Sequence, residues 1–399
     1  MSVRSRVRAT GALATATAAA LAMAVPAASA ATARAPQTFT WSGADSAAGV
    51  NNHWSDPGNW QGDVAPTTAQ PVNLVFPPLH CAATGPCGNG SVNDLTGLQV
   101  SRLTIQTAAV TGQAAVGPNY ELSGNAISLS MGLVMTRQPS KRLPNNPAFL
   151  LPIQLADSQT WSMDRSSLFE YARVTGPSAT LTLKVAHRSD LLMQSGGADL
   201  GGLNLIGADP ADTGVHAREN GQVVATGGAP FTVTGAVTVT DAAAFLHGTV
   251  GPLSLPGSQL WLGTSVAAGE ETVSATGNIA FGSQSILNIN GLFPGKAGQS
   301  YPQIRATGSV ALGGAVTTIS AGCAQRKGTL YTLITAKGGV SGTLSRIDDG
   351  VVKPISQGAV IETQENDAEG SCEGPPPQWV QINYNDAAGT VTATAVPRP

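Results

Sequence analysis

The sequence predicts an all-β protein: a right-handed, single-stranded parallel β-helix with a Trp-rich N-terminal cap. Three observations lead to this prediction. Apolar residues alternate with period two along most of the chain, the apolar runs are short and end at Gly, Asn, Ser or Pro, and a unit bounded by glycines repeats. Period two is typical of strands, because successive side chains point to opposite faces. The residues at the ends of the runs supply turn geometry.

The repeat is a unit of two short apolar runs between two glycines. It occurs at 235–248, 251–263, 277–291 and 308–322, and the first glycines are 16, 26 and 31 residues apart. A small β unit with connections of variable length is typical of a solenoid, in which each coil buries its apolar face on its neighbours. A β-sandwich is the competing architecture. Asn-Gly and Asp-Gly turns are scarce and the runs are very short, which favours the β-helix.

The N-terminus has the three parts of a secretory signal peptide. Arg4, Arg6 and Arg8 form a basic opening, an apolar stretch covers 11–25, and Ala28-Ser29-Ala30 gives a small-x-small end. The apolar run is shorter than the roughly 20 residues that span a bilayer as a helix. We expect cleavage after Ala30 and a secreted, extracellular protein, with association to a bacterial cell surface as one form of this localisation.

The charge of the mature chain argues against several partners. The formal net charge of −3 becomes −6 once the three Arg of the leader are removed, and only 11% of the residues are charged. This composition gives no basic stripe for nucleic acid. No second apolar run reaches membrane-spanning length, so the chain is predicted not to span a membrane after signal removal. No cofactor motif is evident.

Four cysteines remain in the mature chain, at Cys81, Cys87, Cys323 and Cys372. An even number in an exported chain favours disulfides, and four cysteines allow three pairings. The spacing favours Cys81–Cys87 and Cys323–Cys372, but the sequence alone leaves the choice open. A metal site is the alternative, although neither C-x-x-C nor H-x-x-x-H spacing lies nearby. The prediction is therefore disulfides and no metal.

Several segments together carry a resemblance to a known group of proteins. They include Thr-Trp-Ser-Gly at 40–43, the Trp-Ser and Asn-Trp pairs within 51–60, Ala-Pro-Thr at 65–67, Gly-Thr-Leu-Tyr-Thr-Leu-Ile at 328–334 and Val-Gln-Ile-Asn-Tyr at 380–384. In this order they resemble the β-helical passengers of autotransporters. The resemblance implies a passenger-like β-helix whose Trp-rich segment lies at its start. The last resembling segment lies shortly before Pro399, so we do not expect the family's C-terminal translocator barrel.

These observations divide the chain into four parts. Residues 1–30 are the signal peptide, 31–80 the Trp-rich cap and first strands, 81–322 the β-helix coils, and 323–399 the closing coils with a disulfide.

Candidate catalytic groups are few, and each has a plainer interpretation. Asp348-Asp349 is an adjacent pair of aspartates, but it is followed by Gly350 and indicates a turn. Asp209, Asp212 and His216 have two interpretations, as Ca²⁺ ligands or as a solvated loop. The other candidates are polar groups that need not converge in space: His187-Arg188-Ser189-Asp190, Glu270-Glu271 and His53. A catalytic triad is assembled in space, so adjacency in the sequence does not support one. We therefore predict no catalytic residues.

The aromatic residues of the N-terminal segment have two interpretations. Trp41, Trp54 and Trp60 would form a ligand-contact platform on which sugars stack, because aromatic faces bind apolar surfaces. Alternatively they cover the first coil, whose edge would otherwise be open to aggregation. The resemblance favours the second interpretation.

The function predicted is that of a secreted, non-catalytic scaffold, structural or adhesive, whose partner is a cell-wall polymer, a carbohydrate or a host surface. The alternative is an extracellular polysaccharide lyase or hydrolase on a β-helix, which would need two carboxyls held a few ångström apart.

Overall fold

The computed structural model describes residues 35–78, 90–107, 120–137, 147–164, 167–186, 189–193, 196–207, 221–225, 231–263, 272–292, 296–297, 300–321, 326–365 and 379–399. Residues 36–399 form one compact unit. The prediction of an all-β protein is confirmed. The helices of the described residues are a single α-helical turn, α1 (Ala44–Ala47), and a 3₁₀ turn, η1 (Pro57–Asn59).

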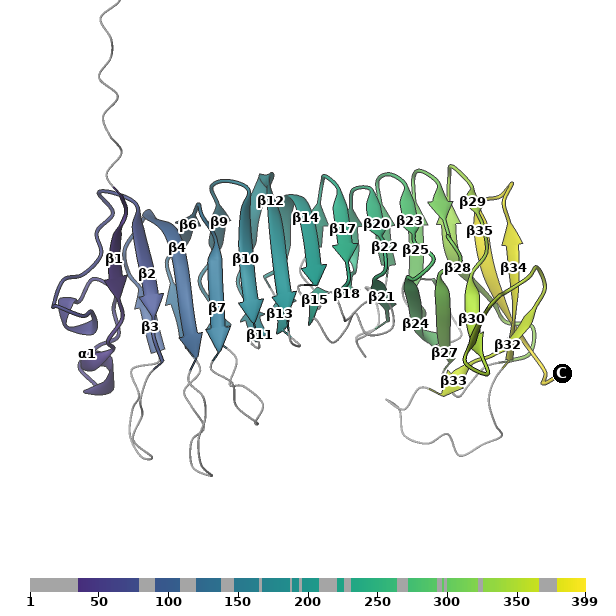
Figure 1. The fold of residues 1–399 in the computed structure, drawn as a ribbon, viewed down its shortest axis with the longest axis horizontal. Helices are drawn as coiled ribbons and strands as arrows, with labels where there is room; N and C mark the ends of the chain where they lie inside the picture. The colour runs from purple at the N-terminus through teal and green to yellow at the C-terminus, as the bar shows by residue number, and fades with distance from the viewer. Residues whose placement is uncertain are drawn as a thin grey trace, which may run out of the picture. The chain divides into compact units, whose positions relative to one another are not determined.

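Two long sheets contain the strands (Figure 1). The larger sheet has 22 strands: β1 (Gln37–Thr40), β2 (Val72–Phe76), β4 (Leu98–Thr107), β6 (Ile127–Leu129), β7 (Leu133–Arg137), β9 (Ile153–Leu155), β10 (Gln159–Asp164), β12 (Val174–Ala186), β14 (Ala198–Gly207), β16 (Phe231–Val233), β17 (Val237–Thr240), β19 (Gly248–Val250), β20 (Leu253–Leu255), β22 (Thr272–Ala275), β23 (Ile279–Phe281), β25 (Gln303–Ala306), β26 (Val310–Ala311), β28 (Leu330–Ala336), β29 (Val340–Ser341), β32 (Val360–Glu362), β34 (Trp379–Asn385) and β35 (Thr390–Val396).

The smaller sheet has 13 strands: β3 (Gly90–Asn93), β5 (Glu121–Gly124), β8 (Ala148–Phe149), β11 (Ser167–Glu170), β13 (Ser189–Met193), β15 (Gly221–Ala225), β18 (Ala243–Phe245), β21 (Gln259–Leu262), β24 (Ile286–Leu292), β27 (Val316–Ala321), β30 (Ser345–Asp348), β31 (Val351–Pro354) and β33 (Gln364–Glu365). From β3 to β30 each strand pairs in parallel with the next along this path.

The larger sheet contains two parallel columns of strands. Long β4 shows this, because its first half pairs with β6 and its second half pairs with β7. A typical coil therefore runs through a first column, a second column and then the smaller sheet, which is the third column. The coil β16, β17 and β18, for example, is followed by the coil β19, β20 and β21. This arrangement of long parallel-strand sheets is consistent with a β-solenoid.

The repeating glycine-bounded unit corresponds to the second and third columns. The unit 235–248 contains β17 and β18, and the unit 251–263 contains β20 and β21. The units 277–291 and 308–322 likewise contain strands of both columns, β23 with β24 and β26 with β27. The predicted repeat is thus two-thirds of a coil. The first-column strand lies in the segment that varies in length between units.

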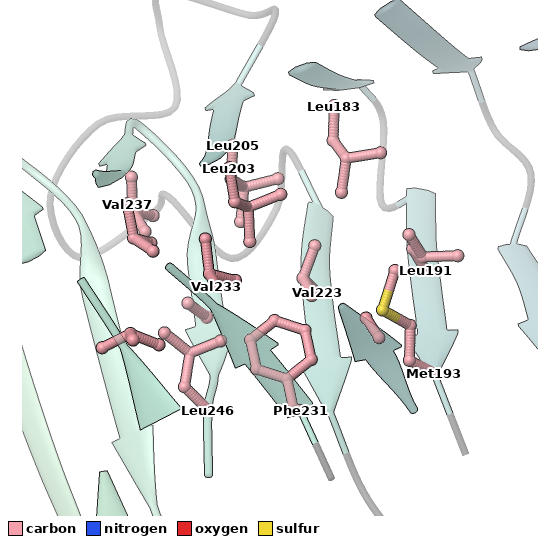
Figure 2. Close-up of a cluster of buried hydrophobic side chains, with 14 of the residues drawn as sticks. Leu183, Leu191, Met193, Leu203, Leu205, Val223, Phe231, Val233, Val237 and Leu246 are labelled. Atoms are coloured by element: carbon pink, nitrogen blue, oxygen red, sulfur yellow. The ribbon is translucent and has the colours of Figure 1, made fainter. Parts of the chain in front are cut away.

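Apolar side chains point inward at alternate positions and stack from coil to coil. In β10 the burial alternates strictly, and Trp161 pairs with Leu183 of β12, which pairs with Leu205 of β14. Each of these three side chains is at most 1% exposed. Figure 2 shows the continuation of this interior, where Leu183 and Leu205 lie near Val223 and Phe231. The period-two pattern of the sequence is therefore the pattern of the core.

The glycines that begin the repeat line the corner between the first and second columns. A Cβ added to Gly235 would lie 2.1 Å from the carbonyl oxygen of Gly201, and one added to Gly251 would lie 2.0 Å from that of Gly235. Likewise, a Cβ on Gly308 would lie 2.8 Å from the carbonyl carbon of Gly277. Distances below 3.0 Å are not tolerated without movement. The corners thus stack backbone on backbone, and this close approach is the reason for glycine.

The last strands reverse direction. β35 pairs antiparallel with β28, β34 pairs antiparallel with β35, and β32 pairs antiparallel with β34. In the smaller sheet, β31 pairs antiparallel with β30 through the turn at Asp349 and Gly350, whose φ angles are 52° and 76°. The turn predicted from Asp-Asp-Gly is confirmed.

Candidate functional site

The three tryptophans of the N-terminal segment lie against one another in the interior. Trp41 and Trp54 are 0% exposed and Trp60 is 1% exposed. Trp60 meets Trp41 edge to face at a centroid distance of 5.2 Å and Trp54 at 6.3 Å, and its indole N–H donates to the carbonyl oxygen of Trp54 at 2.8 Å. Phe76 of β2 contacts all three rings. Burial of these faces favours packing over a sugar-stacking platform.

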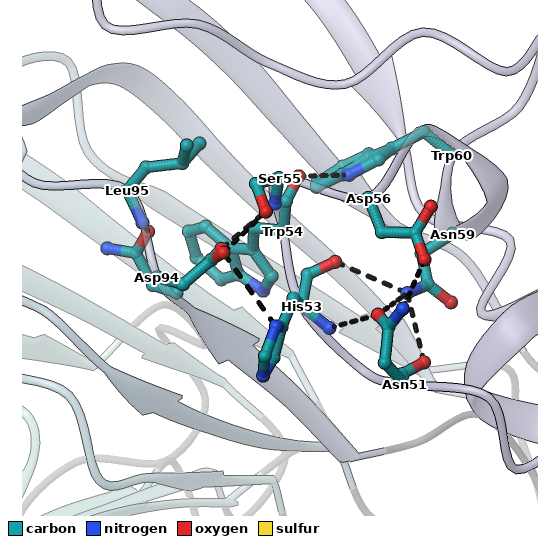
Figure 3. A network of polar contacts seen from close by, with 10 residues as sticks. Asn51, His53, Trp54, Ser55, Asp56, Asn59, Trp60, Asp94 and Leu95 are labelled. Atoms are coloured by element: carbon teal, nitrogen blue, oxygen red, sulfur yellow. Dashed lines mark hydrogen bonds and ion pairs between the residues drawn. The ribbon is translucent and has the colours of Figure 1, made fainter.

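Asn59 is the buried centre of the polar network beside this cluster (Figure 3). Its amide nitrogen donates to the carbonyl oxygens of Asn51 and His53, both at 3.2 Å, and its amide oxygen accepts from the backbone N–H of Ser46 at 2.9 Å. One side chain therefore joins α1, the loop at 51–53 and η1. Buried amides are stable only when hydrogen-bonded, and here both ends are satisfied.

Two carboxyls of this network, those of Asp45 and Asp56, touch each other. Asp56 accepts hydrogen bonds from the Asn51 amide and from the Gly58 N–H, and these bonds hold its pKa below the ordinary value. The pKa of Asp45 is raised, first by partial loss of solvent and then by the charge of Asp56 and a hydrogen bond with it. A carboxyl pair whose pKa values are pushed apart is the arrangement of an acid and its partner base.

Sequence reasoning missed this pair, because the two residues are eleven positions apart and no motif joins them. The only local signal is Asp56 before Pro57-Gly58-Asn59, which is typical of the residue that caps a turn.

Ser55, His53 and Asp94 also lie together, but not as a catalytic triad. The Ser55 hydroxyl donates to Asp94, as does the Ser55 N–H at 2.9 Å, while His53 Nδ1 lies 3.8 Å from the same carboxylate. In a triad the hydroxyl bonds the imidazole, which in turn bonds the carboxylate. Here serine and histidine both approach Asp94. The arrangement ties the loop after Trp54 to the end of β3.

The remaining candidates from the sequence do not gather into one site in the described residues. Asp348 bonds Lys353 at 2.9 Å and Arg346 at 3.4 Å on an exposed hairpin. Ser189 is buried, with its hydroxyl donating to the carbonyl oxygen of Ala186. The following predicted residues lie outside the described residues: Cys81, Cys87, Cys323, Cys372, His187, Arg188, Asp209, Asp212, His216, Glu270, Glu271 and the leader 1–30.

The outward-facing side chains of the second column form a row of hydroxyls and amides. Thr160 of β10 pairs with Thr182, which pairs with Asn204, then Thr238 and then Ser254. The first four are half-buried and Ser254 is exposed. Strands in a sheet lie about 4.8 Å apart, so this row repeats small polar groups at that spacing.

The outer side of the third column is different. Phe245 and Trp261 stack there with ring centroids 5.2 Å apart and an interplanar angle of 17°, and the Trp261 indole donates to Gln259 at 3.0 Å. Phe245 is 7% exposed and Gln259 is 3% exposed. The row of the second column is thus the more open of the two.

Within the described ranges, no group of three or more His, Cys, Asp or Glu side chains is arranged to hold a metal ion. A search of the same ranges for a helix with the length and apolar character needed to cross a bilayer finds none.

Comparison with known proteins yields no relative: no family model, no curated protein and no solved structure matches this chain.

Proposed function

We propose that this chain is a secreted, non-catalytic scaffold, structural or adhesive, outside a bacterial cell. The observation that carries the proposal is the uninterrupted parallel pairing of the third column from β3 to β30. Repeat architectures of this kind present one extended surface, because every coil repeats the outward positions of its neighbour. The acidic groups that do come together near the N-terminus also bond the backbone or amides that shape their loops.

The finer description of the fold belongs to the same proposal. A right-handed coil is favoured because parallel strands joined by crossovers are right-handed in nearly all cases. A cap made by Trp41, Trp54 and Trp60 is supported by their burial beside β1 and β2. Both features agree with the resemblance to autotransporter passengers. A crystal structure showing left-handed coils would refute this part of the proposal.

Export and disulfides are proposed together, and the strand order supports one pairing of the cysteines. Cys81 follows Pro78 by three residues, Cys87 precedes Gly90 by three, and Cys323 follows Ala321 by two. Nine strand spacings separate β3 from β27, which is about 43 Å. A chain spans at most about 3.6 Å per residue. The two or three residues that link each of these cysteines to the nearest described residue, together with the disulfide itself, therefore span at most about 25 Å between Ala321 and either Pro78 or Gly90.

We infer from this distance that Cys323 pairs with neither of the two N-terminal cysteines. If all four cysteines form disulfides within one chain, the pairs are Cys81–Cys87 and Cys323–Cys372. β33 supports the second pair, because Glu365 lies beside Ala321 in the smaller sheet. Peptide mapping of the non-reduced, secreted protein tests the assignment. Four free thiols under denaturing conditions would refute the disulfides, and a Cys81–Cys323 peptide would refute the strand order.

The surface that we propose for binding a wall polymer or another carbohydrate is the row Thr160, Thr182, Asn204, Thr238 and Ser254. Co-sedimentation of the purified chain with insoluble peptidoglycan, chitin or cellulose tests it. The double variant T182E/T238E should weaken binding at least tenfold, because binding would then have to desolvate two carboxylates on this half-buried row. Thr392→Glu on β35, where the threonine is equally half-buried but away from the row, is the matched control. Equal binding by all three proteins would rule out this face.

One observation favours the alternative, a polysaccharide lyase or hydrolase: the contact between Asp45 and Asp56 with their opposed pKa shifts. Glycosidases hold their carboxyls about 5 Å or more apart, to accommodate the substrate bond. A direct carboxyl contact leaves no such room, so the scaffold is preferred. Turnover of pectin, alginate or xylan by the purified chain, abolished in Asp56→Asn, would replace the scaffold with an enzyme.

A further inference from the structure

Glu170, the last residue of β11, is a carboxyl enclosed by the interior of the stack. Its exposed fraction is 0%. Glu121 and Glu362, by contrast, are exposed. The run Ser-Leu-Phe-Glu gives no hint of this, because an acidic residue at the end of a strand ordinarily lies in solvent.

Apolar side chains flank Glu170 in the coils on both sides. Phe149 of β8 and Met193 of β13 occupy the same register in the third column, and they are 0% and 1% exposed. Leu122 lies one coil beyond Phe149 and is also buried. The column at this position is therefore apolar except for one carboxyl.

The carboxyl has one hydrogen-bond partner. Its Oε1 accepts from the backbone N–H of Ala172 at 3.0 Å, and its Oε2 has none. Ala172 lies in the corner that leads from β11 to β12, and its N–H is only 3.4 Å from the alternative acceptor, the carbonyl oxygen of Phe149. The next coil passes closely over this corner, since a Cβ on Gly196 would lie 1.8 Å from the Ala172 oxygen. The Glu170 side chain thus fixes a tightly packed corner.

No charged group among the described residues compensates a Glu170 carboxylate. The register neighbours on β8 and β13 are Phe149 and Met193, and Arg173, the nearest cation along the chain in the described residues, is exposed. Burial raises the pKa of Glu170 well above its ordinary value of 4.5, and the Ala172 N–H opposes that shift. The folded chain therefore retains a proton that the unfolded chain releases.

We propose that Glu170 is a pH-sensitive switch in the interior of the stack: in its neutral form it holds the corner between β11 and β12 closed, and its ionisation opens that corner. A carboxylate at this place would leave a buried charge with an unpartnered oxygen, which is far costlier than a neutral carboxyl. The stabilisation is complete below pH 4.5, the value for the unfolded chain, and is lost as the pH rises toward the raised value in the fold.

Amide hydrogen exchange on the full chain tests the switch. Between pH 4.5 and the raised pKa, the opening constant of the Ala172 N–H should increase up to tenfold per pH unit, after correction for intrinsic exchange. Glu170→Gln, which keeps an acceptor oxygen and cannot ionise, should remove this dependence. Glu121→Gln on β5 is the control in the same sheet and should retain it.

The proposal would be overturned if the opening constant of the Ala172 N–H changed with pH in the same way in wild type and in Glu170→Gln. If Glu170→Gln does not fold, Glu170→Met, which copies the neighbouring Met193, replaces it with the same expected loss of pH dependence. The wild type supplies an independent measurement: an infrared carbonyl band of a protonated carboxyl that persists as the pH rises above 4.5 and is absent from Glu170→Gln. A wild-type spectrum without that band would also overturn the proposal. Neither outcome depends on whether the scaffold binds a polymer.

Discussion

The two ends of the strand stack are completed in different ways. At the N-terminal end, β1 lies on β2 and is followed by a cluster of large rings, with Trp41, Trp54 and Trp60 packed around Phe76. At the C-terminal end, three strands are joined by antiparallel pairing, beginning with β35 on β28 and continuing with β34 and β32. Large buried aromatic rings distinguish the first end, whereas the second is distinguished by antiparallel strands that bury smaller side chains such as Val380 and Val391.

This difference predicts different sensitivities to mutation. A few large buried side chains concentrate the stabilisation at the N-terminal end, so losing one ring removes much of it. Backbone bonds are shared among many residues at the C-terminal end, and each contributes only about 0.5–1.5 kcal/mol. Solenoid repeats contact mainly their neighbours, so damage at one end should stay there.

Trp60→Ala should have the largest effect. The ring is 1% exposed and contacts Phe39, Trp41, Trp54 and Phe76, so its loss should cost about 3–5 kcal/mol, the range for large aromatic truncations in cores. Urea unfolding measures the loss. Hydrogen exchange of the Gln61 N–H, which bonds the Thr40 oxygen at 2.8 Å, reports the N-terminal end locally.

Trp261→Ala is the matched control, because this indole is only half-buried and stacks on Phe245 on the outer side of the third column. It should cost clearly less than Trp60→Ala and leave the Gln61 N–H protected. An equal cost for the two variants would contradict the special role of the N-terminal rings.

Gly251→Ala moves the perturbation to the middle of the stack, away from both ends. The new methyl group would meet the Gly235 oxygen at 2.0 Å, so overpacking should cost about 1–3 kcal/mol. Gly282→Ala is the control, since its nearest contact would be an ordinary 3.4 Å. It should be neutral or stabilising by up to about 1 kcal/mol, because alanine restricts the unfolded chain. Equal unfolding midpoints for Gly251→Ala and Gly282→Ala would show that the backbone at the corner moves to accommodate the added methyl group.

The corner glycines also show what the sequence could and could not predict. The strands of the unit 251–263 were predictable, because alternation along one strand is a local property. The glycines were visible as boundaries, but their stacking depends on which coil lies beside which. The contact between Asp45 and Asp56 and the burial of Glu170 are likewise set by chain segments distant in the sequence. Period and turn chemistry therefore determined the class of fold, while the polar sites required the three-dimensional arrangement.

Tyr384→Phe tests the C-terminal end with a smaller change. The Tyr384 hydroxyl donates to the Ile355 oxygen at 3.0 Å and accepts from the Leu344 N–H at 3.2 Å, so it ties β34 to the last coil. Its removal should cost about 0.5–1.5 kcal/mol and speed exchange of the Leu344 N–H. Protection of the Gln61 N–H should not change. Faster exchange at both ends would show that the ends are coupled and that the comparison fails.

Acid should produce the smallest effect, and it should be larger at the N-terminal end. The pKa of Asp56 lies below its ordinary value of 3.8, chiefly because of the hydrogen bond from the Asn51 amide and next because of that from the Gly58 N–H. A lowered pKa contributes stability that is present above the unfolded value and is lost as the pH falls through the folded one, so loosening should begin below about pH 4. The pKa of Asp45 is raised, so this residue contributes stability at low pH and limits the net loss of stability in acid.

The hairpin carboxyl of Asp348 is the internal comparison for that titration. Its pKa is also lowered, by the hydrogen bond and charge of Lys353, but the pair is exposed on β30 and β31, where ion pairs contribute little. Exchange of the Gly58 N–H, which bonds Asp56, should therefore accelerate between pH 4 and 3 more than exchange in the hairpin. Because Asp56 accepts hydrogen bonds from both the Asn51 amide and the Gly58 N–H, its protonation weakens the acceptor on which the loop before Trp60 depends. Asp56→Asn should abolish the acid dependence of that loop, whereas Asp348→Asn should leave it intact; the reverse result would assign the acid sensitivity to the C-terminal end.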